Sequence, residues 1–283
     1  MKYGLVLPNM GSYSDARTLA ELARLGEESG WDGFFLSDTI HYGHAAIPTS
    51  DPWIDLAAVA VSTERIKLGL LVSAPPRRRP WKMAREAVTL DHLSNGRLIL
   101  GVGSGDEHDL AFEAFGEEMD LKKRARMLDE SLDILQGLWS GKPFSYQGEH
   151  YQVDEITFLP PPVQASGIPL WIGWLWPYKK PLARAARYEG ANPFAVNPDG
   201  SYAQLTPADI QELKQLIDER RSQDKAFDIA IHAQVFAAAN DEQKRSKLQA
   251  YAEAGVTWAL GGFFSVFDAE EVRKTIRQGP PSL

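Results

Sequence analysis

The sequence predicts an α/β protein whose eight strand–helix units close into a (β/α)8 barrel, the TIM-barrel architecture. Three observations predict this class. Short apolar runs alternate with helical patterns along the chain. Eight such units fit into 283 residues, an ordinary length for a barrel. No linker divides the chain, so we expect a single domain over residues 1–283, with the helices outside a parallel sheet.

Four of the units are predicted before residue 103. Their strands are apolar runs at residues 3–7, 33–36, 66–72 and 97–102. Each of the first three strands is followed by a helix with a recognisable start signal. These signals are Ser14-Asp15, Asp51-Pro52 and Pro80, and Gly30 is placed to end the first helix.

The second half begins with an insertion between the fourth and fifth strands. It contains a long helix at 119–139, a two-stranded excursion at 144–153 and an extended connector at Pro160-Pro161-Pro162. Alternation then resumes with strands at 169–173, 191–194, 229–236 and 257–260, and helices at 181–188, 206–222, 241–254 and 268–278. If no strand forms at 191–194, an open sheet replaces the barrel.

Composition excludes several classes of function. The chain has no cysteine, which excludes disulfides, thiolate zinc sites and cysteine nucleophiles. A formal net charge of −8 argues against a nucleic-acid partner, and no apolar run is long enough for a membrane span. With no signal peptide at the N-terminus, we expect a cytoplasmic protein. The basic cluster Arg77-Arg78-Arg79 is expected to be a solvated loop, with an anionic ligand or a subunit contact as alternatives.

The strand ends predict a site that is poor in reactive side chains. In a barrel the active site lies at the carboxyl ends of the strands. His41 and His44 have the spacing of a metal pair, but no histidine or carboxylate is predicted at the ends of the third, fifth, seventh or eighth strands. We therefore expect no metal site. Paired glycosidase carboxylates, a Schiff-base lysine and a serine elbow are also missing, which favours chemistry supplied by a cofactor.

Three glycines at alternate positions mark the fourth strand: Gly101, Gly103 and Gly105. Glycine weakens a strand, so either the barrel mouth is crowded there or a flat ligand rests on the backbone. A dinucleotide fingerprint is a weaker interpretation, because no helix follows at once and the motif does not open a first βαβ unit.

Five stretches give the chain a resemblance to a known family. They are GWDGFFLSD (30–38), TERIKLG (63–69), RRPWKMAREA (78–87), LDHLSNGRLILGVG (90–103) and FLPPPVQ (158–164). Together with the order of elements, they resemble the bacterial-luciferase-like flavin-dependent monooxygenases and oxidoreductases.

The resemblance implies a (β/α)8 barrel that binds FMN, or alternatively a deazaflavin coenzyme, at its carboxyl-terminal mouth. It implies a monooxygenase acting on a small organic substrate, in which oxygen adds to the reduced ring at C4a and the peroxyflavin attacks the substrate. Deazaflavin members transfer a hydride instead. A separate flavin reductase and a homodimer are the expected partners. The rival interpretation is a non-catalytic member that binds flavin or an apolar ligand.

The resemblance also assigns roles to individual residues. Leu71, Val72 and Ser73 match a bulge on the third strand, often with a non-proline cis peptide, that backs the flavin ring. Gly103, Ser104 and Gly105 match the strand end on which the cofactor lies. Trp171, Gly173, Trp174 and Leu175 match the fifth-strand end that holds the phosphate. Asp38 matches an acidic position beside cofactor or substrate, and we expect it to be catalytic together with His41.

The chain departs from the family pattern at two places. The second strand is usually followed by histidine directly after the acidic residue, where this chain has Thr39, and His41 is the expected substitute. The fifth-strand turn usually has Gly-Gly and a small hydroxyl residue, where this chain has Trp174 and Leu175. We therefore expect weaker phosphate binding, which Trp174→Gly with Leu175→Thr would tighten. Lys179-Lys180 and Gly261-Gly262 are the alternative phosphate sites.

Overall fold

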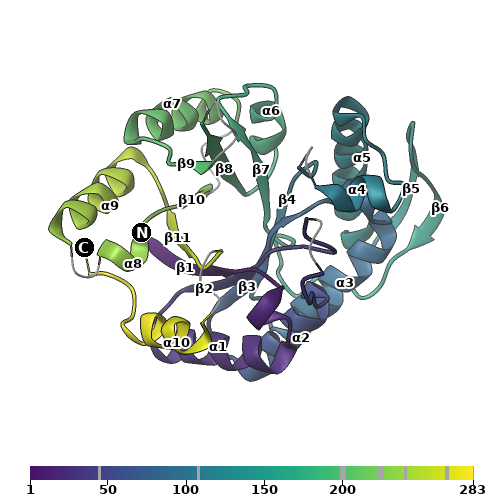
Figure 1. The fold of residues 1–283 in the computed structure, drawn as a ribbon. Coiled ribbons are helices and arrows are strands. Elements are labelled where there is room, and N and C mark those ends of the chain that lie inside the picture. Colours follow the sequence, from purple (N-terminus) through teal and green to yellow (C-terminus); the bar gives the residue numbers. More distant parts are fainter. Residues whose placement is uncertain are drawn as a thin grey trace.

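The computed structural model describes residues 1–43, 46–106, 109–197, 202–221, 226–238, 241–264 and 268–282. Within them, eight parallel strands form a barrel surrounded by helices (Figure 1). The barrel strands are β1 (Lys2–Leu7), β2 (Gly33–Leu36), β3 (Lys67–Ser73), β4 (Leu98–Val102), β7 (Leu170–Trp176), β8 (Gly190–Val196), β10 (Asp228–His232) and β11 (Trp258–Gly262).

The sheet closes on itself through β8. Gly190 pairs with Asp228 and Ala191 with Ile229, while β11 pairs with β1 along five residues. The strand expected at 191–194 therefore exists, and the barrel prediction is confirmed over the open sheet. A short antiparallel strand, β9 (Tyr202–Ala203), extends β8 at its outer end.

The helices begin where the sequence signals place them. Asp15 accepts a hydrogen bond from the Thr18 N–H, and Asp51 accepts from the N–H groups of Trp53 and Ile54. These side chains satisfy donors that have no partner within the helix. The helices are α1 (Ala16–Glu28), α2 (Pro52–Ser62), α3 (Pro80–Leu93), α4 (Leu110–Ala114), α5 (Leu121–Trp139), α6 (Leu182–Ala185), α7 (Pro207–Asp218), α8 (Val235–Ala238), α9 (Glu242–Ala254) and α10 (Ala269–Arg277).

Large rings opposite glycines fill the inside of the barrel. Trp171 and Trp258 meet edge to face with ring centroids 5.4 Å apart, and Phe35 packs against both rings. A Cβ atom at Gly190 would lie 2.3 Å from the Trp171 ring, so glycine there makes room for the indole. Because the interior is packed, a ligand has to bind at the mouth of the barrel rather than within it.

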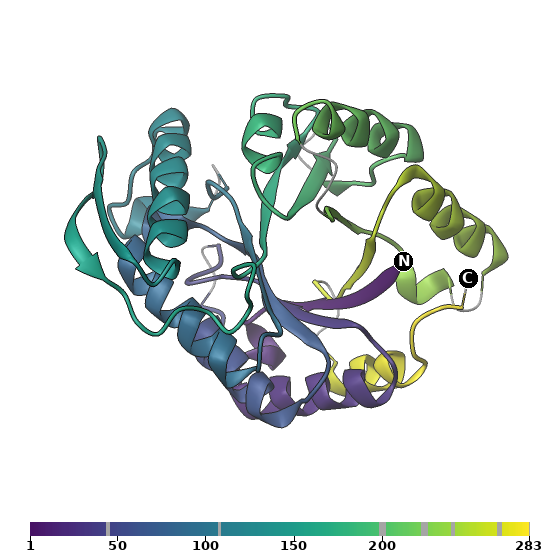
Figure 2. The ribbon, with the colours of Figure 1, turned by 180° about the vertical axis from the view of Figure 1, so that it is seen from behind.

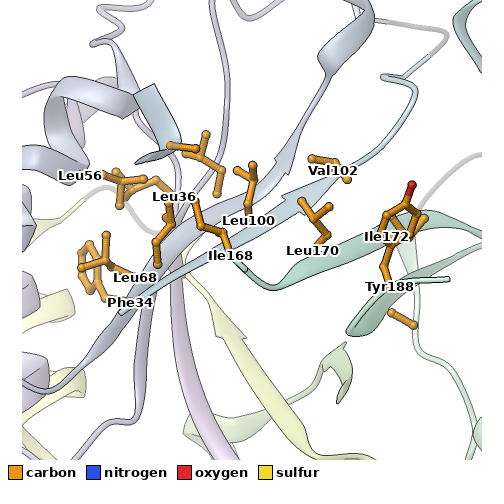
Figure 3. Packing of buried hydrophobic residues seen from close by; sticks show 14 of the residues in the cluster. Phe34, Leu36, Leu56, Leu68, Leu100, Val102, Ile168, Leu170, Ile172 and Tyr188 are labelled. Atoms are coloured by element: carbon orange, nitrogen blue, oxygen red, sulfur yellow. The ribbon is translucent and has the colours of Figure 1, made fainter. Parts of the chain in front are cut away.

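A second apolar layer lies between the barrel and its helices. Figure 3 shows Leu68, Leu100, Val102, Leu170 and Ile172 in this layer, together with side chains from outside the sheet. Along β7 the side chains alternate. Leu170, Ile172, Trp174 and Trp176 belong to the outer layer, and Trp171 lies in the inner cluster. By this alternation Gly173 and Leu175 also face inward.

The predicted insertion between the fourth and fifth barrel strands is confirmed. It contains α4, α5 and an antiparallel hairpin of β5 (Pro143–Gln147) and β6 (Gln152–Thr157), which projects beside α5 in Figure 2. The Glu130 carboxylate accepts hydrogen bonds from the backbone N–H groups of Glu149, His150 and Tyr151. One side chain of α5 therefore holds the hairpin turn against the helix.

The seventh barrel strand is shorter than expected. The predicted strand at 229–236 ends at His232, and Val235 begins the short helix α8. The Phe236 ring stacks on Phe263 and occupies the space that a side chain at Gly261 would fill. An apolar run of this length is ambiguous between strand and helix, and the packing of Phe236 decides it here.

Candidate functional site at the carboxyl end of the barrel

The third strand carries the predicted irregularity. The Leu71–Val72 peptide bond is cis, and the pairing of β3 with β4 shifts register between Leu70 and Ser73. The expected bulge and cis bond are thus confirmed. Leu71 is buried in the barrel interior, and the half-buried Val72 packs against that inner cluster.

Glycines on two neighbouring strands receive the Val72 side chain. Cβ atoms at Gly173 and Gly103 would lie 2.8 Å and 3.4 Å from methyl carbons of Val72. A Cβ at Gly101 would lie 2.6 Å from the Leu70 carbonyl oxygen and from a Leu71 methyl. Gly101 on β4, Gly103 directly after β4 and Gly173 on β7 therefore fit the β3 bulge, and a Cβ at Gly103 would have the loosest contacts of the three.

The other two residues of the glycine motif lie beyond the strand. Gly105 has φ +84°, and a Cβ there would lie 2.5 Å from the Phe112 ring. A turn that needs a positive φ and a close aromatic contact both require glycine at this position. Ser104 is half-buried between the two glycines. Crowding thus accounts for Gly101 and Gly105, whereas at the buried Gly103 a Cβ would meet its nearest atom at 3.2 Å.

Asp38 lies in a buried ion-pair network. Its carboxylate accepts from Ser73 Oγ at 2.5 Å, from Arg78 Nη2 at 2.5 Å and from Arg78 Nε at 3.1 Å. Arg77 donates to the Asp38 carbonyl oxygen and pairs with Asp109. Burial lowers the pKa of Arg78, but the Asp38 carboxylate outweighs this and raises it overall. The solvated-loop interpretation of the arginine cluster is therefore wrong for two of its three members.

The loop after β2 carries His41 and is fastened by Asn9. Asn9 Nδ2 donates to the carbonyl oxygens of Thr39 and Ser50, and Asn9 Oδ1 accepts from the Thr39 N–H. His41 is half-buried on this loop and makes no hydrogen bond within the described part of the chain. His44 lies outside the described residues, as does Glu107 after β4. The catalytic roles of Asp38 and His41 stay predictions.

Asp55 contacts the same loop through Ser50, and the pKa of its carboxyl group is raised. It is buried in the first turn of α2 and accepts from Ser50 Oγ at 2.6 Å. Burial raises its pKa to about 6, with Asp51 and Asp15 adding to the effect and the Ser50 hydrogen bond opposing it. The folded state therefore binds this proton more tightly than the unfolded chain does, and the resulting stabilisation is lost as pH rises from about 4 through about 6.

Asp55→Asn, which mimics the protonated group, should raise the free energy of unfolding at pH 7.5 by on the order of 2 kcal/mol. The gain should shrink towards pH 4, where the wild-type carboxyl group is itself protonated. Urea denaturation of both proteins at several pH values measures this difference. A variant less stable than wild type at pH 7.5 would contradict the prediction.

The fifth barrel strand places its predicted phosphate residues on opposite faces. Trp171 lies inside the barrel, and Trp174 is buried in the outer layer, 8% exposed. Leu175, 37% exposed, faces the mouth. Of the alternative phosphate residues, Lys179 pairs with Glu212, while Lys180 is exposed. The rings of Phe236 and Phe264 occupy the space that side chains at Gly261 and Gly262 would fill.

Two polar residues at the mouth of the barrel are not among the site residues predicted from the sequence. Asn192 is fully buried on β8 and donates from Nδ2 to the Ala230 carbonyl oxygen, while its Oδ1 has no hydrogen-bond partner among the described residues. His232 ends β10, and its buried Nε2 has no partner in the part of the chain that the structure describes. The expectation that no histidine closes the seventh strand is therefore wrong, because the strand ends at His232, four residues before its predicted end. The signal available in the sequence was a polar residue directly after an apolar strand position: Asn192 follows Ala191, and His232 follows residues 229–231.

The described residues contain neither a metal-binding cluster nor a membrane-spanning helix. Within the described ranges, no three His, Asp or Glu side chains are arranged to hold a metal ion. Among the helices of the described residues, none is long and apolar enough to cross a membrane.

The model of the luciferase-like monooxygenase family matches residues 1–279. An F420-dependent glucose-6-phosphate dehydrogenase from Nakamurella multipartita is 36% identical over 172 residues, covering 58% of this chain and 48% of the relative. The oxygenase component of a flavin-dependent trigonelline monooxygenase from Acinetobacter baylyi is 26% identical over 236 residues, covering 80% of this chain and 61% of the relative.

A solved structure shares the fold at low identity. An F420-dependent secondary alcohol dehydrogenase, in complex with an F420–acetone adduct, superposes with a TM-score of 0.77 at 17% identity, covering 98% of this chain and 97% of the other. The matches span about half to two thirds of the length of the curated relatives. Because the family model covers nearly the whole sequence, the chain belongs to the luciferase-like monooxygenase family.

Proposed function

We propose that this protein is an FMN-dependent monooxygenase of a small organic substrate and that it binds the flavin ring at the mouth of its barrel. The observation that supports this most is the inward-facing row of Gly103 and Gly173 beside the β3 bulge. A flat ring needs a wall without side chains and a fixed backing. The two glycines and Val72 offer both on adjacent strands.

The residues at the mouth fit such a group. Val72 would back the ring, Gly103 and Gly173 would let it approach the backbone, and the unpartnered Oδ1 of Asn192 would accept a hydrogen bond from it. Asp38 would act indirectly, because it fixes Ser73 at the end of the bulge. When bound, the cofactor supplies the redox chemistry that the side chains lack. A phosphate position at the Gly173–Leu175 backbone stays a prediction.

A deazaflavin-dependent hydride transfer is the second candidate function. Curated relatives at 34–36% identity are F420-dependent glucose-6-phosphate dehydrogenases. Titrating the protein separately with FMN and with the deazaflavin coenzyme, each followed by fluorescence, decides between the two. Binding of neither at high micromolar concentration would contradict both candidates.

The partners follow from the same proposal. Two relatives are described as an oxygenase component and an oxygenating constituent, which supports a separate flavin reductase as the source of reduced cofactor. A homodimer, a cytoplasmic location and the single-domain organisation stay predictions. Light scattering on the purified protein tests the dimer.

Gly103→Leu should reduce FMN affinity at least about 100-fold, because the isobutyl group would fill the space above Val72 where the ring is proposed to lie. Gly103→Ala is the matched control. Its Cβ would lie 3.2 Å from the Gly173 carbonyl oxygen, which is a tight but tolerable contact, so a smaller loss is expected. Calorimetric titration with FMN measures both. Wild-type affinity in a folded Gly103→Leu protein would place the ring elsewhere.

A further inference from the structure

One buried nitrogen at the mouth has no partner in the site described above. His232 lies between Phe194 and Phe264, with ring centroids 5.2 Å and 5.7 Å away. Its Nε2 atom is enclosed and makes no hydrogen bond to any residue that the structure describes. Burial alone lowers its pKa to about 4, with no contribution from a neighbouring charge, so the imidazole is neutral at neutral pH.

The strand register gives the position of His232 relative to the proposed ring site. Gly173 pairs with Asn192, and Leu175 pairs with Phe194 two residues further out. Continuing the β8–β10 register places Ala230 beside Asn192 and His232 beside Phe194. Side chains two residues apart on a strand share a face. His232 and Phe194 therefore lie one layer above the row of Gly173 and Asn192, on the outer side of the mouth.

The unpaired nitrogen needs an explanation. A buried polar group without a partner destabilises the folded state, and native proteins contain few of them. A phenylalanine would fill the gap between Phe194 and Phe264 without this cost. A bound molecule that forms a hydrogen bond with Nε2 would explain why histidine stands here.

The charges around the mouth restrict what that molecule can be. The segments after β8, β10 and β11, residues 197–206, 233–241 and 263–268, contain no lysine or arginine. In the loops after β3 and β7, Arg77 and Arg78 pair with carboxylates and Lys179 pairs with Glu212, while Lys180 is exposed. The three segments that follow these strands therefore offer a phosphorylated substrate no permanent cation, whereas a neutral oxygen needs none.

We propose that His232 binds the oxygen of a neutral substrate, a hydroxyl or carbonyl compound whose apolar body lies against Phe194. The identification of this molecule as the substrate rests on the proposed function. A neutral imidazole can donate to a carbonyl or accept from a hydroxyl through the appropriate nitrogen. Phe264, 47% exposed, covers this place and has to turn aside when the molecule enters. His232 thereby becomes a specificity-determining residue.

The test compares benzyl alcohol with toluene, which lacks the hydroxyl group, on the full chain. Histidine-selective ¹⁵N labelling gives signals for the six histidines, and the His232 signals are those lost in His232→Phe. Benzyl alcohol should shift the His232 nitrogens and bind about tenfold more tightly than toluene. Toluene should leave them near their free positions.

His232→Phe keeps the aromatic packing but removes both nitrogens, so its preference for benzyl alcohol should fall to within about twofold of toluene. His92→Gln, an exposed histidine hydrogen-bonded to Pro161, is the control and should keep the wild-type preference. An unchanged preference in His232→Phe, or binding of glucose 6-phosphate as tight as that of benzyl alcohol, would overturn the proposal.

The FMN and deazaflavin titrations separate this result from the proposed function. His232→Phe should bind the cofactor as wild type does, since His232 lies above the ring site. If neither cofactor binds while benzyl alcohol still shifts the His232 nitrogens, the flavin assignment fails and the pocket assignment stands.

Discussion

Arg78→Met should lower the free energy of unfolding by about 3 kcal/mol. The Asp38 carboxylate is fully buried, and Arg78 holds both of its oxygens. After the substitution, the Asp38 carboxylate retains the hydrogen bond from Ser73 and a longer contact with Arg77 Nη2 at 4.0 Å. A buried charge that loses its principal partner costs far more than an exposed pair contributes. Urea denaturation at pH 7.5 measures the loss.

Arg79→Met is the matched control within the same tripeptide. Arg79 is exposed, so its loss should change stability by less than about 0.5 kcal/mol. Adding Asp38→Asn to Arg78→Met removes the stranded charge and should recover at least about 1 kcal/mol. A loss below about 1 kcal/mol in Arg78→Met would show that the network tolerates an unpaired Asp38.

Trp174→Gly should destabilise the protein by about 4 kcal/mol, because it empties a large site in the outer layer. The sequence alone suggested a different outcome, in which this change together with Leu175→Thr opens a phosphate site. The structure places the indole between barrel and helices, so its removal leaves a cavity there instead. Thermal or urea unfolding measures the effect, and Trp81→Ala, at a more exposed tryptophan, serves as the control.

Leu175→Thr alone retains the useful part of that experiment. Leu175 faces the mouth, and a threonine there adds a hydroxyl group at little cost in stability. If the phosphate lies at this strand end, FMN should bind more tightly and riboflavin, which has no phosphate, should not. Equal changes for both ligands would argue for a phosphate elsewhere.

The sequence by itself determined the barrel class and the start of most helices. These features depend on neighbouring residues: apolar runs of strand length, capping side chains such as Asp15 and Asp51, and prolines at first turns. Resemblance to the family added the β3 bulge and the cis Leu71–Val72 bond, which no local pattern shows.

Only the tertiary structure decided which side chains meet at the mouth. Strands of a parallel barrel are apolar on both faces, so no polar alternation reveals that Trp171 points inward and Trp174 outward. The end of β10 at His232 depends on Phe236 packing over Gly261, and the burial of Arg78 depends on Asp38, forty residues earlier in the chain. These contacts join segments far apart in sequence, and their geometry is fixed only when the barrel closes.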